Sequence, residues 1–196
     1  MSIVTLVSGG LDSTVMAVLA KEEGLTQFPL FIDYGQISRE KELKACLLNF
    51  QRYKLPTPMI AHLEGYGAMI SSGLTDPGKN IFEDAFLPCR NLMFLTIGAA
   101  YAFQCGASAI TIGLLNESFS LFADQTKAFI RAAESAISIS LGRSMRILTP
   151  LMSLSKAEVL GIAKSKGITG TYSCHAGTDE PCGVCVACRE YIDLEV

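Results

Sequence analysis

The amino-acid sequence predicts an α/β protein built around a parallel β-sheet. Short β-rich runs alternate with longer helical stretches, an order that is typical of right-handed βαβ units. The 196 residues are 49% hydrophobic, which is enough apolar material for one sizeable core. A glycine-containing turn joins the first strand to the first helix, at the carboxyl end of a strand, where open parallel sheets bind their ligands.

The positions of the elements follow from these runs. Strands are expected at residues 2–8, 28–34, 57–62, 109–113 and 145–149, and helices at 12–23, 37–51, 90–105, 122–141 and 155–166. Ser155 and Glu158 predict a capping box at the start of the last helix, and Gly167 is a typical helix end. The stretch from Glu64 to Ala85 is expected to be a long loop, which we interpret as a substrate lid.

The turn after the first strand combines glycines with hydroxyl side chains. Two glycines let the backbone approach an anion closely, and the following helix offers unpaired amides and a partial positive charge. The spacing lacks the lysine of G-x-x-x-x-G-K-[ST], so this is not the P-loop that cleaves ATP at its γ-phosphate. The run SGGLDST instead resembles the PP-loop of enzymes that split ATP between the α- and β-phosphates, which implies that Asp12 holds Mg²⁺ or orients the phosphates; the alternative is an ordinary serine/glycine turn. The expected nucleotide-binding residues are Ser8, Gly9, Gly10, Leu11, Asp12, Ser13 and Thr14.

Four cysteines near the other end have the spacing C-x(7)-C-x(2)-C-x(2)-C. They are Cys174, Cys182, Cys185 and Cys188. Such spacing predicts a tetrahedral zinc site, which has no open coordination position and is therefore structural. A disulfide pair or an iron–sulfur cluster are the alternatives, and His175 could replace one cysteine. We expect two units, residues 1–168 with the nucleotide site and residues 169–196 with the zinc site, because bound metal can supply on the order of 10 kcal/mol to a segment with little apolar core.

Charge and composition narrow the class of partner. The net charge is −3 and the pI about 5.4, so no overall positive field favours nucleic acid, and a small-molecule substrate is the better expectation. No signal peptide precedes the first strand and no apolar run approaches the ~18 residues of a membrane span, so a cytoplasmic protein without membrane contact is expected.

Together the two motifs carry a family resemblance that extends over nearly the whole chain. The sequence resembles 7-cyano-7-deazaguanine synthase, the PP-loop enzyme of queuosine and related deazapurine pathways. Besides the two motifs, the resemblance rests on Asp33-Tyr34-Gly35-Gln36, Pro88-Cys89-Arg90-Asn91-Leu92, Pro150-Leu151 with Lys156 and Glu158, and Thr171-Tyr172-Ser173-Cys174. It implies a Rossmann-like ATP-pyrophosphatase fold with a zinc-bound extension, usually as a homodimer.

The resemblance also implies a reaction. In the family, ATP adenylates 7-carboxy-7-deazaguanine, ammonia displaces AMP to give an amide, and a second ATP activates the amide, which becomes the nitrile. Catalysis of this kind depends on positioning and on neutralising charge at the departing pyrophosphate. The candidate catalytic residues are Asp12, Lys156 and Arg90, although Lys156 and Arg90, both at helix starts, could equally be solvated surface charges.

The departures from the family pattern fall where the deazapurine should be held. The family usually continues DYGQ with Arg-His, whereas this chain has Ile37-Ser38. After the fourth strand the family pattern D-Y-S-G-Y-P-D-C-R-P-E-F corresponds to residues 118–129, where Asp124 and Phe129 are kept but the acidic residue at 118, the arginine at 126 and the glutamate at 128 are absent. Cys89 replaces the glycine of a PGRN turn, and a positive φ there would be strained.

Three functions are therefore compatible with the sequence. The first is nitrile synthesis from 7-carboxy-7-deazaguanine and ammonia with ATP, Mg²⁺ and Zn²⁺. The second is a divergent PP-loop ligase that stops at an amide or uses another amine, including one on a protein. The third is a zinc scaffold that binds nucleotide without acyl chemistry.

Overall fold

The computed structural model of the protein describes residues 1–192 and 194. Its sheet has five strands in the order β3-β2-β1-β4-β5, and every neighbouring pair is parallel. The strands are β1 (Ser2–Val7), β2 (Thr26–Asp33), β3 (Met59–His62), β4 (Ala109–Thr111) and β5 (Arg146–Leu148). All five strands predicted from the sequence are confirmed, and with them the parallel α/β fold.

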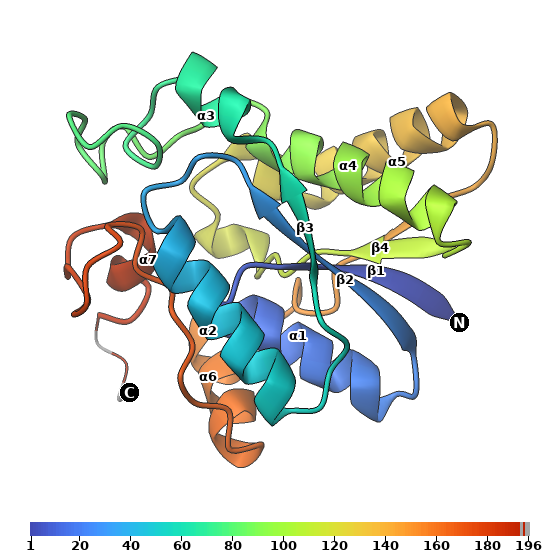
Figure 1. Cartoon of the computed structure of the whole chain (residues 1–196), viewed down its shortest axis with the longest axis horizontal. Coiled ribbons are helices and arrows are strands. Elements are labelled where there is room, and N and C mark those ends of the chain that lie inside the picture. The colour runs from blue at the N-terminus through green and yellow to red at the C-terminus, as the bar shows by residue number, and fades with distance from the viewer. Residues whose placement is uncertain (193, 195–196) are drawn as a thin grey trace.

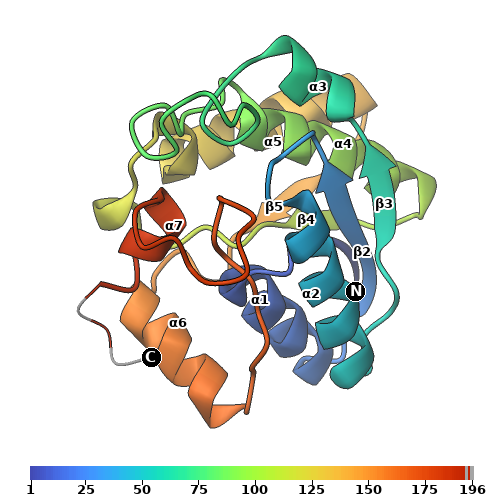
Figure 2. The same cartoon turned by 60° about the vertical axis from the view of Figure 1, so that its left-hand side comes forward.

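Helices cover both faces of this sheet (Figures 1 and 2). The helices are α1 (Leu11–Glu22), α2 (Arg39–Arg52), α3 (Glu64–Met69), α4 (Arg90–Gln104), α5 (Lys127–Leu141), α6 (Lys156–Ser165) and α7 (Val186–Arg189), with 3₁₀ turns η1 (Glu117–Phe119) and η2 (Ala123–Gln125). Helices α1, α2 and α6 pack on one face, and α4 and α5 on the other. None of the helices in the described part of the chain is long and apolar enough to cross a bilayer.

Successive residues of a strand point to opposite faces of the sheet, so each strand contributes side chains to the cores on both faces. Leu6 of β1 joins the core formed with Leu95 of α4, whereas the next residue, Val7, joins the core formed with Val15 of α1. All four of these side chains are buried. A strand buried on both faces reads as a continuous apolar run rather than an alternating one, as β1 does.

Two predicted elements differ from the structure. The expected long loop from Glu64 to Ala85 begins with the short helix α3, and only the part after Met69 is built from turns. The helix expected over 122–141 begins at Lys127, because Thr126 caps it by accepting the backbone N–H of Phe129 at 3.2 Å. The capping box of Ser155 and Glu158 is present as predicted.

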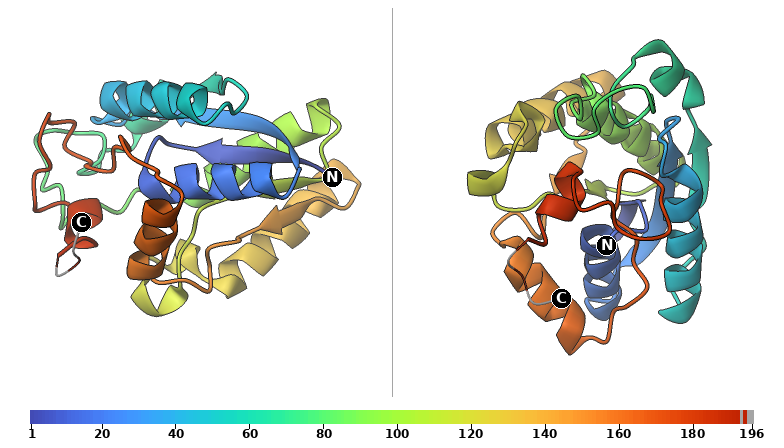
Figure 3. Two further views of the ribbon diagram at one scale, coloured as in Figure 1. Left: turned by 90° about the horizontal axis from the view of Figure 1, so that it is seen from below. Right: turned by 90° about the vertical axis from the view of Figure 1, so that its left-hand side faces the viewer.

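The strand order reverses beside β1. This strand pairs with β2 on one side and with β4 on the other, so the crossovers leave it in opposite directions. Ligands of open parallel sheets bind at such a switch point, beyond the carboxyl ends of the strands. The turn between β1 and α1 lies there, and Figure 3 shows the C-terminal segment, in red, at the same end of the sheet.

Gly9 in that turn has a φ of +81°, and a Cβ atom built on it would lie 2.2 Å from the backbone oxygen of Glu42. We therefore expect Gly9→Ala to lower the free energy of unfolding by about 3 kcal/mol, because left-handed backbone and overpacking each cost about 1–3 kcal/mol. Urea unfolding followed by circular dichroism measures this. Gly161→Ala is the control, since its Cβ would meet open space on α6, and it should be neutral or slightly stabilising. Equal stabilities for the two variants would contradict the account.

Candidate functional site

The turn from Ser8 to Thr14, here called the phosphate loop, is held in shape by its own side chains. Thr14 Oγ1 donates to the Gly10 carbonyl at 2.8 Å, and the Ser13 hydroxyl accepts the Ser8 amide at 3.2 Å. Ser8 Oγ in turn accepts the Gly10 amide at 3.3 Å. The loop is thus preformed at the amino end of α1, as an anion site requires.

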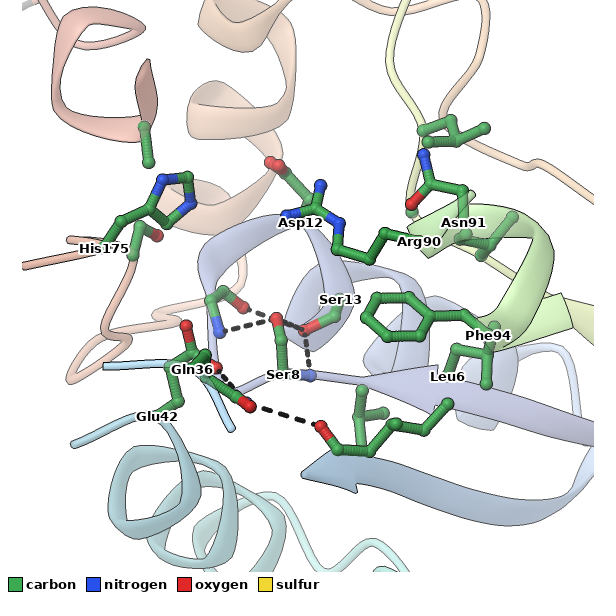
Figure 4. A pocket seen from close by; sticks show the side chains of 18 of the residues that line it. Leu6, Ser8, Asp12, Ser13, Gln36, Glu42, Arg90, Asn91, Phe94 and His175 are labelled. Atoms are coloured by element: carbon green, nitrogen blue, oxygen red, sulfur yellow. Dashed lines mark hydrogen bonds between the residues drawn. The ribbon is translucent and has the colours of Figure 1, made fainter. Parts of the chain in front are cut away.

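A cavity of about 260 Å³ opens over this loop (Figure 4). Of the predicted nucleotide-binding residues, Ser8, Gly10, Leu11, Asp12 and Ser13 line it. Gly9 and Thr14 do not line it and contribute to the backbone shape of the loop instead. The apolar part of the wall comes from Leu6, Leu30, Ile32, Leu74, Phe94 and Ile112, and the polar part beyond the loop from Gln36, Glu42, Arg90, Asn91, Gln125, Lys156, His175 and Glu190.

A second cavity of about 580 Å³ adjoins the first, and Asp12 and Lys156 line both. Its walls are mostly the segment after β4, the start of α6 and the C-terminal residues around Arg189 and Glu190. The Asp12–Lys156 pair therefore borders both cavities.

Lys156 is brought to the phosphate loop by the start of α6. Its Nζ lies 2.9 Å from both carboxylate oxygens of Asp12 and 2.8 Å from Glu190 Oε2, with only 11% of the side chain exposed. Burial disfavours the ammonium, but the charges of Asp12 and Glu190 outweigh burial and raise the pKa of Lys156. The solvated-surface reading of Lys156 is therefore wrong, and its cation is fixed beside the loop.

Arg90 also faces the cavity, from the first turn of α4. Its guanidinium lies 5.9 Å from the centre of the Phe94 ring. The preceding residue, Cys89, is exposed and has a φ of +58°, so the strained positive φ suspected at this turn is confirmed.

Two buried ionisable residues, Glu42 and His175, line the same cavity, and burial shifts the pKa of each. Burial is the main cause that raises the pKa of Glu42, whose carboxylate accepts from Ser38 Oγ at 2.6 Å and Gln36 Nε2 at 3.1 Å. Burial, followed by the charges of Arg90 and Lys156, lowers the pKa of His175 to about 4. The imidazole of His175 shares the cavity with the cationic side chains of Arg90 and Lys156.

The four cysteines near the C-terminus form one cluster. Their sulfur atoms all lie within 4.8 Å of one another, and the sulfurs of Cys182 and Cys188 are 3.9 Å apart. Zn–S bonds of about 2.3 Å place the sulfurs of a tetrahedron about 3.8 Å apart, so this donor set fits a metal ion. The backbone amides of residues 182, 185 and 188 donate to cluster sulfurs at 3.4 Å, which favours thiolates. His175 is not part of the cluster, and all four thiols are free.

The chain that leads into this cluster is docked on the phosphate loop. The Tyr172 amide donates to the Gly9 carbonyl at 2.9 Å, and Ser173 Oγ lies 3.5 Å from the Leu11 amide. On the far side of the cluster, the Tyr191 ring lies 4.9 Å from Lys156 Nζ. The cysteine segment therefore forms part of the wall of the cavity over the phosphate loop.

Comparison of the sequence with known proteins identifies the family of this chain. A family model described as "Queuosine biosynthesis protein QueC" matches residues 2–191. The chain belongs to the QueC family. A 7-cyano-7-deazaguanine synthase from a Nitratiruptor species is 33% identical over 201 residues, covering 96% of this chain and 91% of that protein. The synthase of Campylobacter concisus is 35% identical over 204 residues, covering 95% and 90%.

Solved structures confirm the fold of this QueC family member at low identity. A predicted subunit of tRNA methyltransferase from Methanocaldococcus jannaschii has a TM-score of 0.55 at 18% identity, covering 84% of this chain and 74% of that one. The U34-tRNA thiolase NcsA from Methanococcus maripaludis also has a TM-score of 0.55, at 16% identity, covering 86% and 58%.

The residues that depart from the family pattern have structural partners here. Ser38, at the start of α2, bonds Glu42, and Thr126, where the pattern has arginine, caps α5. The retained Asp124 accepts the Asn91 amide at 3.4 Å and ties the segment to α4. The substitution at 126 removes the arginine charge of the family pattern, and the hydroxyls of Ser38 and Thr126 are both hydrogen-bonded.

Sequence reasoning missed Glu190 and His175 as cavity residues. Both lie in the cysteine segment, whose spacing drew attention to the metal alone. Glu190 and Lys156 are far apart in the sequence and their ion pair leaves no periodic signal, so only the folded chain reveals it.

We expect chelation to loosen the C-terminal segment while the sheet stays folded, because the cluster residues bury little apolar surface of their own and a metal at the four sulfurs would hold them together. Limited trypsin digestion followed by mass spectrometry should show faster cleavage at Arg189 after chelation. Cys185→Ser should already be cut rapidly without chelator, whereas Cys105→Ser, outside the cluster, should behave as wild type. Unchanged cleavage of the chelated protein would contradict a structural metal.

Replacing Cys89 by glycine should raise the free energy of unfolding by about 1 kcal/mol, because a left-handed non-glycine residue costs about 1–2 kcal/mol. Cys89→Ala separates this effect from loss of the thiol, since alanine keeps the strain. Chemical denaturation of the two variants should therefore give different midpoints, and identical midpoints would show that the backbone is relaxed at this residue.

Proposed function

We propose that the protein converts 7-carboxy-7-deazaguanine and ammonia to 7-cyano-7-deazaguanine at the expense of ATP. Two observations support the proposal: the match to the QueC family over residues 2–191, and a cavity lined by the phosphate loop, including Asp12, together with Lys156 and Arg90. A carboxylate is a poor electrophile, so adenylation supplies the leaving group that ammonia displaces. A second adenylation, of the amide oxygen, allows loss of AMP and leaves the nitrile.

The residues of the loop would bind and orient the polyphosphate. The amides at the amino end of α1 face the departing pyrophosphate, and the cations of Lys156 and Arg90 neutralise the charge that develops there. Lys156 must exchange part of its contact with Asp12 or Glu190 for the phosphates. Asp12 is the carboxylate placed to hold Mg²⁺, which, when bound, screens the phosphate charge and orients the leaving group.

The metal at Cys174, Cys182, Cys185 and Cys188 is, on this proposal, Zn²⁺. Support comes from the four-thiolate donor set and the tetrahedral spacing of its sulfurs. Its role is to hold the segment from Tyr172 to Tyr191 against the phosphate loop. Reduced thiols of this kind favour a cytoplasmic location, and the family resemblance favours a homodimer.

A second candidate function is an amide ligase that stops after the first adenylation or uses a larger amine, including one on a protein. It is favoured by the neutral residues at 118, 126 and 128 and by the second cavity, which is wider than ammonia requires. Under this alternative, ATP still yields AMP, but no nitrile forms.

Mass spectrometry of a reaction with zinc-loaded protein, Mg·ATP, 7-carboxy-7-deazaguanine and ammonium tests the proposal. The 7-cyano product and AMP are expected from wild type and from Glu40→Gln, a matched carboxylate change on the exposed side of α2. Asp12→Asn and Lys156→Met should lower turnover at least ~100-fold, because each removes a charge contact at the phosphates. AMP with only the amide would establish the ligase, and no AMP would exclude both adenylating functions.

A further inference from the structure

His175 has no hydrogen-bonding partner for a buried ring nitrogen. Its Nδ1 is the sole buried side-chain nitrogen or oxygen without a partner among the residues that the structure describes. Buried polar atoms are nearly always hydrogen-bonded, and a lone exception points to a missing ligand or water. The ring lines the cavity over the phosphate loop, and Figure 4 shows it turned into this space together with the Arg90 side chain.

The backbone of His175 is fixed although its ring is unpartnered. Its amide donates to Cys185 Sγ at 3.5 Å, and the residues before it are bound to the phosphate loop through the Tyr172 amide and the Gly9 carbonyl. The ring is therefore held at the phosphate end of the cavity. It is not one of the four grouped metal ligands, so metal binding would not supply its missing partner.

The cations that share the cavity with the ring indicate the ligand. Arg90 and Lys156 line the same cavity as His175, and Arg90 forms no ion pair among the described residues, so an anion is the group that this end of the cavity favours. Anionic oxygens only accept hydrogen bonds, and an imidazole ring carries at least one N–H that can donate one. Donation to a charged oxygen is stronger than donation to a neutral one.

We propose that the imidazole of His175 donates a hydrogen bond to a phosphate oxygen of the nucleotide bound at the phosphate loop, and that it thereby selects triphosphate over uncharged nucleoside. This inference rests on the proposed use of ATP and adds a nucleotide-binding residue from the metal-binding segment. His175 acts on the affinity for the phosphates, and the apolar wall around Phe94 holds the remainder of the ligand.

Calorimetry of the full-length, zinc-loaded protein tests the proposal with two probes, the Mg²⁺ complex of α,β-methylene ATP and adenosine. His175→Phe keeps the ring shape without its nitrogens and should weaken the ATP analogue about 10- to 100-fold, the effect of one hydrogen bond to a charged group. Adenosine affinity should not change. His175→Gln keeps a donor and should recover part of the affinity. Metal content, measured on each variant, should stay at one ion per chain.

Nuclear magnetic resonance gives a readout that a purely structural role would not move. The chain has two histidines, so comparison with His175→Phe assigns the ring signals of His175 directly. Its ring N–H signal should shift on addition of the ATP analogue and remain in place with adenosine.

The outcomes are distinct. Equal affinity of wild type and His175→Phe for the ATP analogue would overturn the proposal, as would parallel losses for both probes. If His175→Phe loses its metal, the test uses wild type and His175→Gln alone. A wild-type ring signal that does not move at saturating ATP analogue overturns the proposal. A ring signal that shifts, together with retained affinity of His175→Gln for the ATP analogue, supports it. Failure of wild type to bind the ATP analogue would instead refute the proposed function.

Discussion

The close packing of the phosphate loop between α2 and the cysteine segment is the constraint on which the site depends. A side chain at Gly9 would collide with the Glu42 carbonyl on one side, while the Gly9 carbonyl accepts the Tyr172 amide on the other. The loop's own hydrogen bonds shape the turn, and these two neighbours fix where it lies. One of them is a helix in the core, and the other is the segment that carries the four cysteines, so on the proposed function metal binding and nucleotide binding would be physically linked.

The positive charge of Lys156 beside the phosphate loop is balanced by two carboxylates. Lys156 is shared between Asp12 and Glu190, so the buried cation is compensated before any ligand arrives. On the proposed function, incoming phosphates would replace one of these carboxylates, which would cost part of the binding energy but keep the lysine in position. Arg90 carries no comparable ion pair in the described structure and is available to an anion at once.

Much of this could be predicted from the sequence, because the signals are local. The strand-glycine-helix run around Gly9 and the cysteine spacing each encode a backbone shape within a few residues. The positions of Glu190 and His175 in the cavity wall could not be predicted, because they arise where segments that are distant in the sequence meet. Helix α3 was missed because its two glycines resemble a loop, although tertiary packing, with Gly67 donating to the Tyr34 carbonyl at 3.0 Å, overrides that preference.

The most direct test of the link between metal and nucleotide site is hydrogen exchange at the Tyr172 amide, measured by nuclear magnetic resonance with and without the bound metal. The account predicts that chelation abolishes protection at Tyr172 and lowers it at the phosphate-loop amides, while Leu95 in the core of α4 keeps its protection. Full protection of Tyr172 in the metal-free protein would contradict the account, because the cysteine segment would then stay docked on the phosphate loop without metal.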